Sequence, residues 1–169
     1  MKKNTLIALA LSLTFAATTG VHAQIPTQAV LTQKNLSLAL ANQLAATSVA
    51  ACAANGYAVT ATVVDRAGTV RAVQRADNAG PHTLGASPQK AFTSASAKNT
   101  TLAIMETSQT NPGAANLVNI PGYLLLGGGV PVKVGNEVIG AIGVGGAPAG
   151  NLDEQCAMAA LDQAKDLLK

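Results

Sequence analysis

The sequence predicts an α+β domain in which helices cover one antiparallel sheet, in the order α-β-β-α-β-β-α. Three features support this class. An apolar stripe at helical spacing comes first, two pairs of short valine-rich segments follow, and each pair is joined by a tight turn. Strands joined by tight turns are antiparallel, and the stretches between and after the two pairs have helical character. Neither a second domain nor an internal repeat is indicated.

The first half of this pattern is a helix followed by a hairpin. Leucines at helical spacing predict a helix over 32–55, with Thr32 as its N-cap and Gly56 at its C-terminal cap. Apolar residues then alternate along a strand that ends at the turn "DRAG", residues 65–68, and a second strand returns as far as residue 75. These segments form the first predicted hairpin, over 57–75.

A second helix is predicted over 88–107. Ser87 is the expected N-cap and Pro88 the first helical residue, which is a favourable combination at a helix start. The interior of this helix is rich in serine and threonine, so packing rather than intrinsic propensity must stabilise it. Residues 108–123 are expected to form an irregular connection with at most one short helical turn.

The segment 127–146, "GGGVPVKVGNEVIGAIGVGG", contains eight of the sixteen glycines. Its valine-rich parts, 130–134 and 138–144, flank Gly135-Asn136, a pair that suits a two-residue hairpin turn. The segment therefore predicts the second hairpin, and its glycines mark places where another backbone or a flat ligand approaches closely.

The last helix is expected to begin at Asn151 and to run to Lys169. Asn151 is a good N-cap, and Glu154 lies three residues further on, in a capping-box arrangement.

The glycines do not form a nucleotide-binding loop. A dinucleotide fingerprint that starts at Gly143 has Pro148 at its sixth position, where glycine is needed, and the lysine of a P-loop is missing. The short strands and the tight turn also exclude the crossover connection of a parallel unit.

The first 23 residues have the layout of a secretory signal peptide. Lys2 and Lys3 precede an apolar run over 6–17, and small residues end at Ala23. This run of twelve residues, which includes Ser12 and Thr14, is too short for a membrane anchor, because a bilayer core is about 30 Å thick and a helix rises about 1.5 Å per residue. We therefore expect cleavage after Ala23, a single domain over 24–169, and a periplasmic or secreted protein.

The composition indicates an oligomer. Only 11% of the residues are charged and 2% aromatic, whereas 49% are hydrophobic. Burial in subunit interfaces is one way for so uncharged a surface to be covered, since interface cores are depleted in charge. Removal of the leader lysines leaves a nearly neutral chain with scattered basic residues, which excludes the clustered basic surface of a nucleic-acid-binding protein.

Two cysteines, Cys52 and Cys156, remain after cleavage. In an oxidising compartment such a pair predicts a disulfide, which would act as a structural staple or, alternatively, as a redox-active bond. Two buried free thiols are the other interpretation, because one pair gives no diagnostic spacing.

Several motifs closely resemble the GlcG/HbpS family of haem-binding proteins, which also includes the domain attached to PduO-type cobalamin adenosyltransferases. The motifs are "DRAG", "RAD", "SPQKAFTSAS" and the glycine-rich segment with the following "NLDEQCA", and the resemblance extends over 32–168. It implies a profilin-like or PAS-like α+β fold, frequent assembly into octamers, and haem or a related tetrapyrrole as ligand. The family motif covers seven residues of the first hairpin and second helix: Asp65, Gly68, Arg75, Asp77, Lys90, Ala91 and Thr93.

Haem iron requires an axial ligand, usually histidine, methionine, cysteine or tyrosine. His82 is the only histidine outside the leader, and it lies in a Gly/Pro loop before the second helix. It is the leading candidate for the metal ligand. The alternatives are Met105, Met158, Tyr57 and Tyr123.

The haem propionates require cations or helix N-termini. Arg71, Arg75 and Lys90 are expected around the junction that carries His82, with Thr93 nearby in the family motif. Any haem site with so few aromatic residues is expected to be weak or to lie between subunits.

Two other classes of function remain open. An enzyme acting on a small organic acid could hold the carboxylate with Arg75 and move protons with Asp65 or Asp77, although a turn role explains Asp65 more simply. A periplasmic accessory could instead report haem or redox state to a membrane sensor partner. The serine-hydrolase elbow is missing, and one histidine does not make a usual zinc site.

Overall fold

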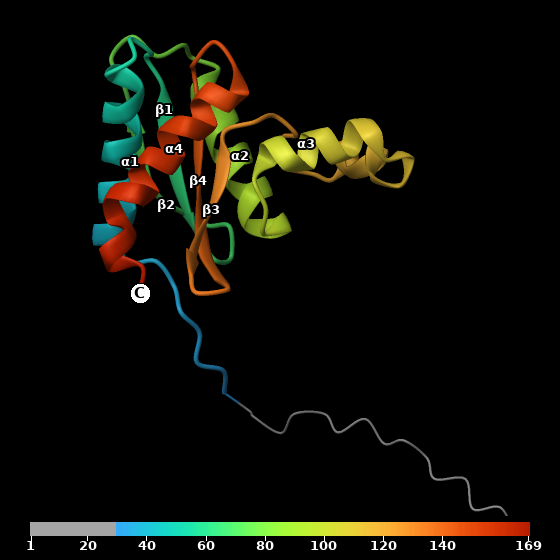
Figure 1. Ribbon diagram of the computed structural model, residues 1–169, viewed down its shortest axis with the longest axis horizontal. Helices are drawn as coiled ribbons and strands as arrows, with labels where there is room; N and C mark the ends of the chain where they lie inside the picture. Colours follow the sequence, from blue (N-terminus) through green and yellow to red (C-terminus); the bar gives the residue numbers. More distant parts are fainter. Residues whose placement is uncertain (1–29) are drawn as a thin grey trace, which may run out of the picture. The chain divides into compact units, whose positions relative to one another are not determined.

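The structure is a computed structural model that describes residues 30–169 (Figure 1). The predicted signal peptide over 1–23 lies outside the described residues. Residues Gln33–Lys169 form one compact unit. Within the described part of the chain, no helix is long and apolar enough to span a membrane.

Both predicted hairpins are present, and together they form a four-stranded antiparallel sheet. The strand order is β2-β1-β4-β3, so the first strands of the two hairpins are not neighbours; β1 pairs with β4 instead. Gly135, with a positive φ of 59°, lies in the tight turn between β3 and β4. The predicted α+β class is therefore confirmed. The strands are β1 Thr60–Asp65, β2 Val70–Arg75, β3 Gly129–Val134 and β4 Glu137–Gly145.

Helices cover both faces of this sheet. Helices α1 and α4 pack side by side on one face, whereas α2 lies on the other face over β1, β4 and β3 (Figure 1). The segment of α3 and η1 extends to one side of the sheet (Figure 1). The helices are α1 Leu38–Ala53, α2 Thr83–Ala97, α3 Thr101–Thr110, η1 Pro112–Asn119, α4 Gly150–Ala164 and η2 Lys165–Leu167.

The middle helix differs most from its prediction. It begins at Thr83, five residues early, and Ser87 and Pro88 lie inside it. The reason is tertiary, because hydroxyl pairs fix this part of the helix to β1: Thr60 with Thr83 at 2.7 Å, and Thr62 with Ser87 at 2.8 Å. These bonds offset the backbone bond that proline cannot donate.

The second helix, which is predicted to continue to residue 107, is also interrupted. Lys98 adopts a left-handed conformation with a φ of 55° and ends α2. The side chain of Thr100 then accepts a hydrogen bond from the Ala103 amide and starts α3 as a separate helix. The order is thus α-β-β-α-α-β-β-α, with a 3-10 helix in the predicted irregular connection.

Helices α1 and α4 also begin at residues other than those predicted. The N-cap of α1 is Ser37, whose hydroxyl accepts from the Leu40 amide, rather than Thr32. Helix α4 has Ala149 at its N-cap and no side-chain cap, so the predicted capping box of Asn151 and Glu154 does not form. It ends at Ala164 and continues as η2.

The predicted disulfide between Cys52 and Cys156 is present and links α1 to α4. It lies in the main core between these helices and the sheet. Every residue of β1 is buried, because helices cover both faces of this central strand. The alternation of apolar residues in the sequence of this strand therefore does not separate a buried face from a solvent-exposed face.

The glycines of β4 allow α2 to lie directly on the sheet. A Cβ atom at Gly143 would clash with the carbonyl oxygen of Ser87 and would lie 2.5 Å from the Ala91 amide nitrogen. Gly140 similarly has no room for a side chain beside Leu36 and the Val64 carbonyl. The expected close backbone approach is confirmed at these positions, although Gly145 makes only ordinary contacts.

This packing gives a pair of opposite predictions for two glycines. Gly143→Ala should lower the free energy of unfolding by about 1–3 kcal/mol, because α2 must move away from β4. Gly85→Ala should raise it by about 0.5–1 kcal/mol, because Gly85 lies in α2 with open space around it and alanine favours the helix. Urea denaturation of both variants would show whether the sign reverses as expected. Equal effects would contradict the packing argument.

Candidate functional site

Arg75 and His82 lie together at one end of the molecule. Arg75 ends β2 opposite Thr60, and the hydroxyl of Thr60 pairs with Thr83 at the start of α2. His82 is the N-cap residue of that helix, and its ring packs against Gly80. Arg75 donates a hydrogen bond to the Ala79 carbonyl in the same loop. The sequence-based expectation that these two residues share a junction therefore agrees with the structure.

Next to this junction, no helix of residues 30–169 lies above one face of β2. Val73 pairs with Thr62, whose hydroxyl points to α2, so Val73 lies on the α2 side of the sheet. Helix α2 packs on the other three strands, and Val70 and Val73 remain 50% and 46% exposed. The outer side of α2 adds three apolar residues, four positions apart: Leu84, Pro88 and Phe92. We refer to these five residues as the α2–β2 face: Val70, Val73, Leu84, Pro88 and Phe92.

A shallow groove lies at the far end of the α2–β2 face. It has a volume of about 270 Å³, and none of its lining residues is charged. The ring of Phe92 stands edge-to-face against Tyr123, with the centroids 6.2 Å apart. The lining residues come from the first hairpin, α2 and the loop after η1: Gly68, Val70, Pro88, Gln89, Phe92, Pro121 and Gly122.

Arg71 follows Val70 on β2. The pairing of β1 with β2 shifts between Val63 and Val64, and Arg71 is the extra residue of β2 at that irregularity. Its side chain is exposed, as is that of Arg75. Exposed cations thus accompany the apolar residues along β2.

Lys90 and Thr93 are not part of this surface, which corrects their predicted roles. Lys90 is only 1% exposed, and its Nζ donates to Asp153 Oδ2 at 2.7 Å and to the Val144 carbonyl at 2.9 Å. Thr93 is buried, and its hydroxyl donates to the Gln89 carbonyl and accepts from the Leu124 amide. Both side chains bond to groups inside the protein, so they do not reach a ligand on the α2–β2 face.

The acid/base pair considered for an enzyme does not form either. The carboxylate of Asp65 accepts hydrogen bonds from the amides of Ala67 and Thr69, as expected for a turn residue. Asp77 is exposed and follows the other end of β2. The two aspartates therefore lie at opposite ends of the hairpin.

The alternative haem ligands are dispersed. Tyr123 lies next to the groove through its contact with Phe92. Tyr57 packs against the core between α1, α4 and the sheet, Met158 is exposed on α4, and Met105 belongs to α3. Of the four, only Tyr123 is close to the α2–β2 face.

A buried ion pair that the sequence-based reasoning missed joins α2 to α4. Asp153 accepts from Lys90 and, through Oδ1, from the Ala147 amide at 2.9 Å. Burial raises the pKa of Asp153, while the hydrogen bond and charge of Lys90 oppose that rise. The sequence did contain a signal for this pair, because Asp153 lies on the same buried face of its helix as Cys156, Ala157 and Ala160. A carboxylate on such a stripe needs a buried partner.

Loss of one partner of this pair should be costly. We expect Lys90→Met to lower the free energy of unfolding by about 3–5 kcal/mol, because it leaves a buried carboxylate without a counter-charge. Adding Asp153→Asn removes that charge, so the double variant should recover part of the loss. Chemical denaturation of both single variants and the double variant measures the coupling. Strictly additive losses would contradict a direct interaction.

Glu154, the neighbour of Asp153, lies between α4 and the start of α3. Burial raises the pKa of its carboxyl, while hydrogen-bond donors at Leu102, Gly128 and Thr100 lower it less strongly. Its Oε2 is buried and has no hydrogen-bond partner among residues 30–169. The carboxylate thus lies where the charged form is disfavoured.

This position predicts a pH-dependent stability. The folded-state pKa of Glu154 is raised above its ordinary value of 4.5, so protonation of this carboxyl stabilises the fold. The contribution to the free energy of unfolding is fully present when the pH is below that ordinary pKa. This contribution is lost as the pH rises through the folded-state pKa. Between about pH 4 and pH 7, the free energy of unfolding should therefore fall less steeply in Glu154→Gln than in the wild type. Identical slopes in urea titrations would contradict the assignment.

These features define a class: an antiparallel α+β protein with an uncovered apolar face and a histidine and arginine at one end of it. The chain belongs to the family described as haem degrading protein HbpS-like, whose family model matches residues 36–162. The profilin-like or PAS-like arrangement implied by the resemblance is thus confirmed at the level of an antiparallel sheet with helices on both faces.

The similarity extends to curated relatives and solved structures. Protein GlcG of Escherichia coli K12 is 34% identical over 109 residues, which cover 62% of this chain and 80% of GlcG. The crystal structure of HbpS is 36% identical with a TM-score of 0.75 and covers 80% of this chain and 94% of that one. A crystal structure of a PduOC–haem complex, 23% identical with a TM-score of 0.67 over 76% of this chain and 94% of that one, shares the fold.

Proposed function

We propose that this protein binds haem, or a similar flat anionic tetrapyrrole, on the α2–β2 face. The observation that supports this proposal most directly is that exposed apolar residues lie next to exposed Arg75 and His82 at one end of β2. Membership of a family described as haem degrading supports the choice of ligand, as does the haem in the PduOC complex.

The residues present fit such a group. A porphyrin has an apolar ring and carries its two propionates on one edge, and the α2–β2 face has apolar side chains beside a cationic end. Five residue steps along β2, from Val70 to Arg75, extend over about 17 Å at about 3.3 Å each. In this proposal Val70, Val73 and Leu84 would contact the ring.

Two side chains would hold the ligand's polar parts. The guanidinium of Arg75 can form charge-assisted hydrogen bonds with a propionate. Arg71 offers a second exposed cation four residue steps away along β2, about 13 Å at about 3.3 Å each. His82 is the candidate axial ligand, since its imidazole is exposed at the same junction. Bound haem would supply a redox-active iron, while the protein binds and orients it.

We further propose that the face is completed by another copy of the chain. The groove is open and, at about 270 Å³, too small to enclose a tetrapyrrole. The half-exposed apolar residues of β2 and α2 would be covered in such a homo-oligomer. An octamer is the assembly that the family resemblance favours.

Export to the periplasm or beyond is also proposed, on the basis of the leader sequence. The disulfide between Cys52 and Cys156 supports an oxidising compartment. A membrane sensor partner for such an exported haem protein remains a proposal that rests on the same leader. The alternative of an enzyme acting on a small organic acid gains no support from Asp65, because its carboxylate is bonded within its own turn.

Titration with hemin tests the ligand. The wild-type protein should give a saturable Soret shift, and His82→Ala should change the position of the bound band. Arg75→Gln should weaken binding by about tenfold, as expected for loss of one charge-assisted bond. Lys133→Gln removes an exposed charge from the opposite edge strand, β3, and is the matched control.

Each outcome has a distinct meaning. A Soret shift that is retained unchanged in His82→Ala removes that ligand but keeps haem. Equal weakening by Arg75→Gln and Lys133→Gln would show a general charge effect rather than a site. No saturable shift at micromolar protein would overturn the proposed function.

A further inference from the structure

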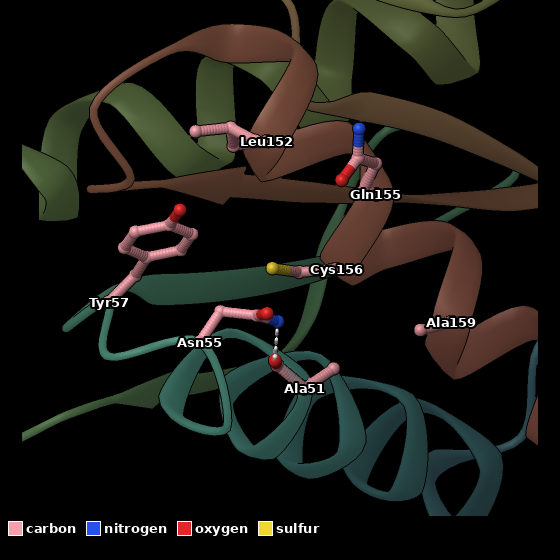
Figure 2. A pocket seen from close by; sticks show the side chains of 7 residues that line it. All are labelled: Ala51, Asn55, Tyr57, Leu152, Gln155, Cys156 and Ala159. Carbon is pink, nitrogen blue, oxygen red and sulfur yellow. Dashed lines mark hydrogen bonds between the residues drawn. The ribbon is translucent and has the colours of Figure 1, made fainter.

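The two cysteines of the disulfide differ in their surroundings. Cys52 is 0% exposed and lies in the main core, whereas Cys156 is 4% exposed and lines a cavity between α1 and α4. Figure 2 shows the sulfur of Cys156 pointing into the space between Tyr57, Asn55 and Gln155. This cavity lies on the face of the sheet opposite α2, away from the α2–β2 face.

The cavity is small and uncharged. Its volume is about 120 Å³, similar to the ~150 Å³ of an engineered cavity that admits a benzene-sized molecule. The hydroxyl of Tyr57 and the amides of Asn55 and Gln155 can donate and accept hydrogen bonds. One of these amides is already oriented, since Asn55 Nδ2 donates to the Ala51 carbonyl at 3.0 Å (Figure 2). The lining residues are Ala51, Asn55, Tyr57, Leu152, Gln155, Cys156 and Ala159.

We propose that this cavity admits a small thiol with no charged group besides its reactive thiolate, which opens the disulfide by exchange at Cys156. The thiolate sulfur attacks Cys156 Sγ and forms a new S–S bond, while the bond to Cys52 breaks and Cys52 leaves as a thiolate that takes a proton from water. A second thiol can attack the outer sulfur of the mixed disulfide, which releases the small disulfide and leaves two reduced cysteines.

The geometry selects both the attacked sulfur and the size of the reductant. Exchange requires access to a sulfur atom, and only Cys156 borders the cavity. A folded reductase cannot reach a residue that is only 4% exposed and borders so small a cavity. The disulfide closes a loop with a sequence separation of 104 residues, so its opening removes a covalent link between α1 and α4.

The test is the reaction of the purified oxidised protein with 2-mercaptoethanol and, in parallel, with glutathione. Reactions are stopped in acid with N-ethylmaleimide, and peptides are mapped by mass spectrometry while circular dichroism follows the fold. We expect the mixed disulfide at Cys156, maleimide at Cys52, and a rate proportional to thiol concentration. At equal thiolate concentration, 2-mercaptoethanol should react at least about tenfold faster than glutathione, which is larger and charged.

Variants separate local access from unfolding. Ala159→Leu fills the cavity and should slow the exchange at least about tenfold, which corresponds to about 1.4 kcal/mol in the activation free energy. Ala39→Leu changes an exposed alanine of α1 outside the cavity and is the matched control. Gln155→Trp, at an exposed lining position, offers a second way to obstruct the cavity if Ala159→Leu does not fold.

Three results would overturn the proposal: adducts divided equally between Cys52 and Cys156, a rate that does not depend on thiol concentration, or no adduct while the fold persists. The first two would show exchange through global unfolding, and the third a sealed disulfide. The position of the adduct in the wild type decides the matter without any variant. Hemin binding is measured on the other face of the sheet, so the two proposals can fail separately.

Discussion

The contact between α2 and the glycines of β4 is the constraint on which the rest of the structure depends. With no side chain at Gly143, the helix backbone reaches the strand, and the hydroxyls of Thr83 and Ser87 come within hydrogen-bond distance of β1. A helix held so close to the centre of the sheet covers β1, β4 and β3 but leaves β2 uncovered. The exposed face proposed for the ligand is a consequence of where the helix is held.

The same contact explains the buried charges. Because α2 lies against the sheet, Lys90 extends into the interior, where the Val144 carbonyl and Asp153 accept its hydrogen bonds. Gly128 allows this, since a Cβ atom there would lie 3.0 Å from Lys90 Nζ. Such a pair contributes little net stability compared with apolar residues of similar volume, but either charge without the other is costly. It therefore fixes how α2, β4 and α4 meet.

The two sides of the sheet have different chemical character. On the α2 side, an open apolar surface lies next to exposed cations, which suits a flat amphipathic ligand or another subunit. On the α1 and α4 side, the covalent link between Cys52 and Cys156 lies beside a small polar cavity. The central strand β1 is buried between them, so the two surfaces share a scaffold but no side chains.

The sequence by itself determined the α+β class and both hairpins, because alternation and turn residues are local signals. The cysteine count predicted the disulfide but left two free thiols open, and the structure shows the bond. The sequence also placed Arg75 and His82 at one junction. Only the tertiary structure decided where α2 begins, since hydroxyl bonds to β1 outweigh the start signal of Ser87 and Pro88. The tertiary structure likewise decided that Lys90 is buried. A charge is buried only where it finds a partner, and the partner of Lys90, Asp153, is distant along the chain, so no local sequence pattern reveals it.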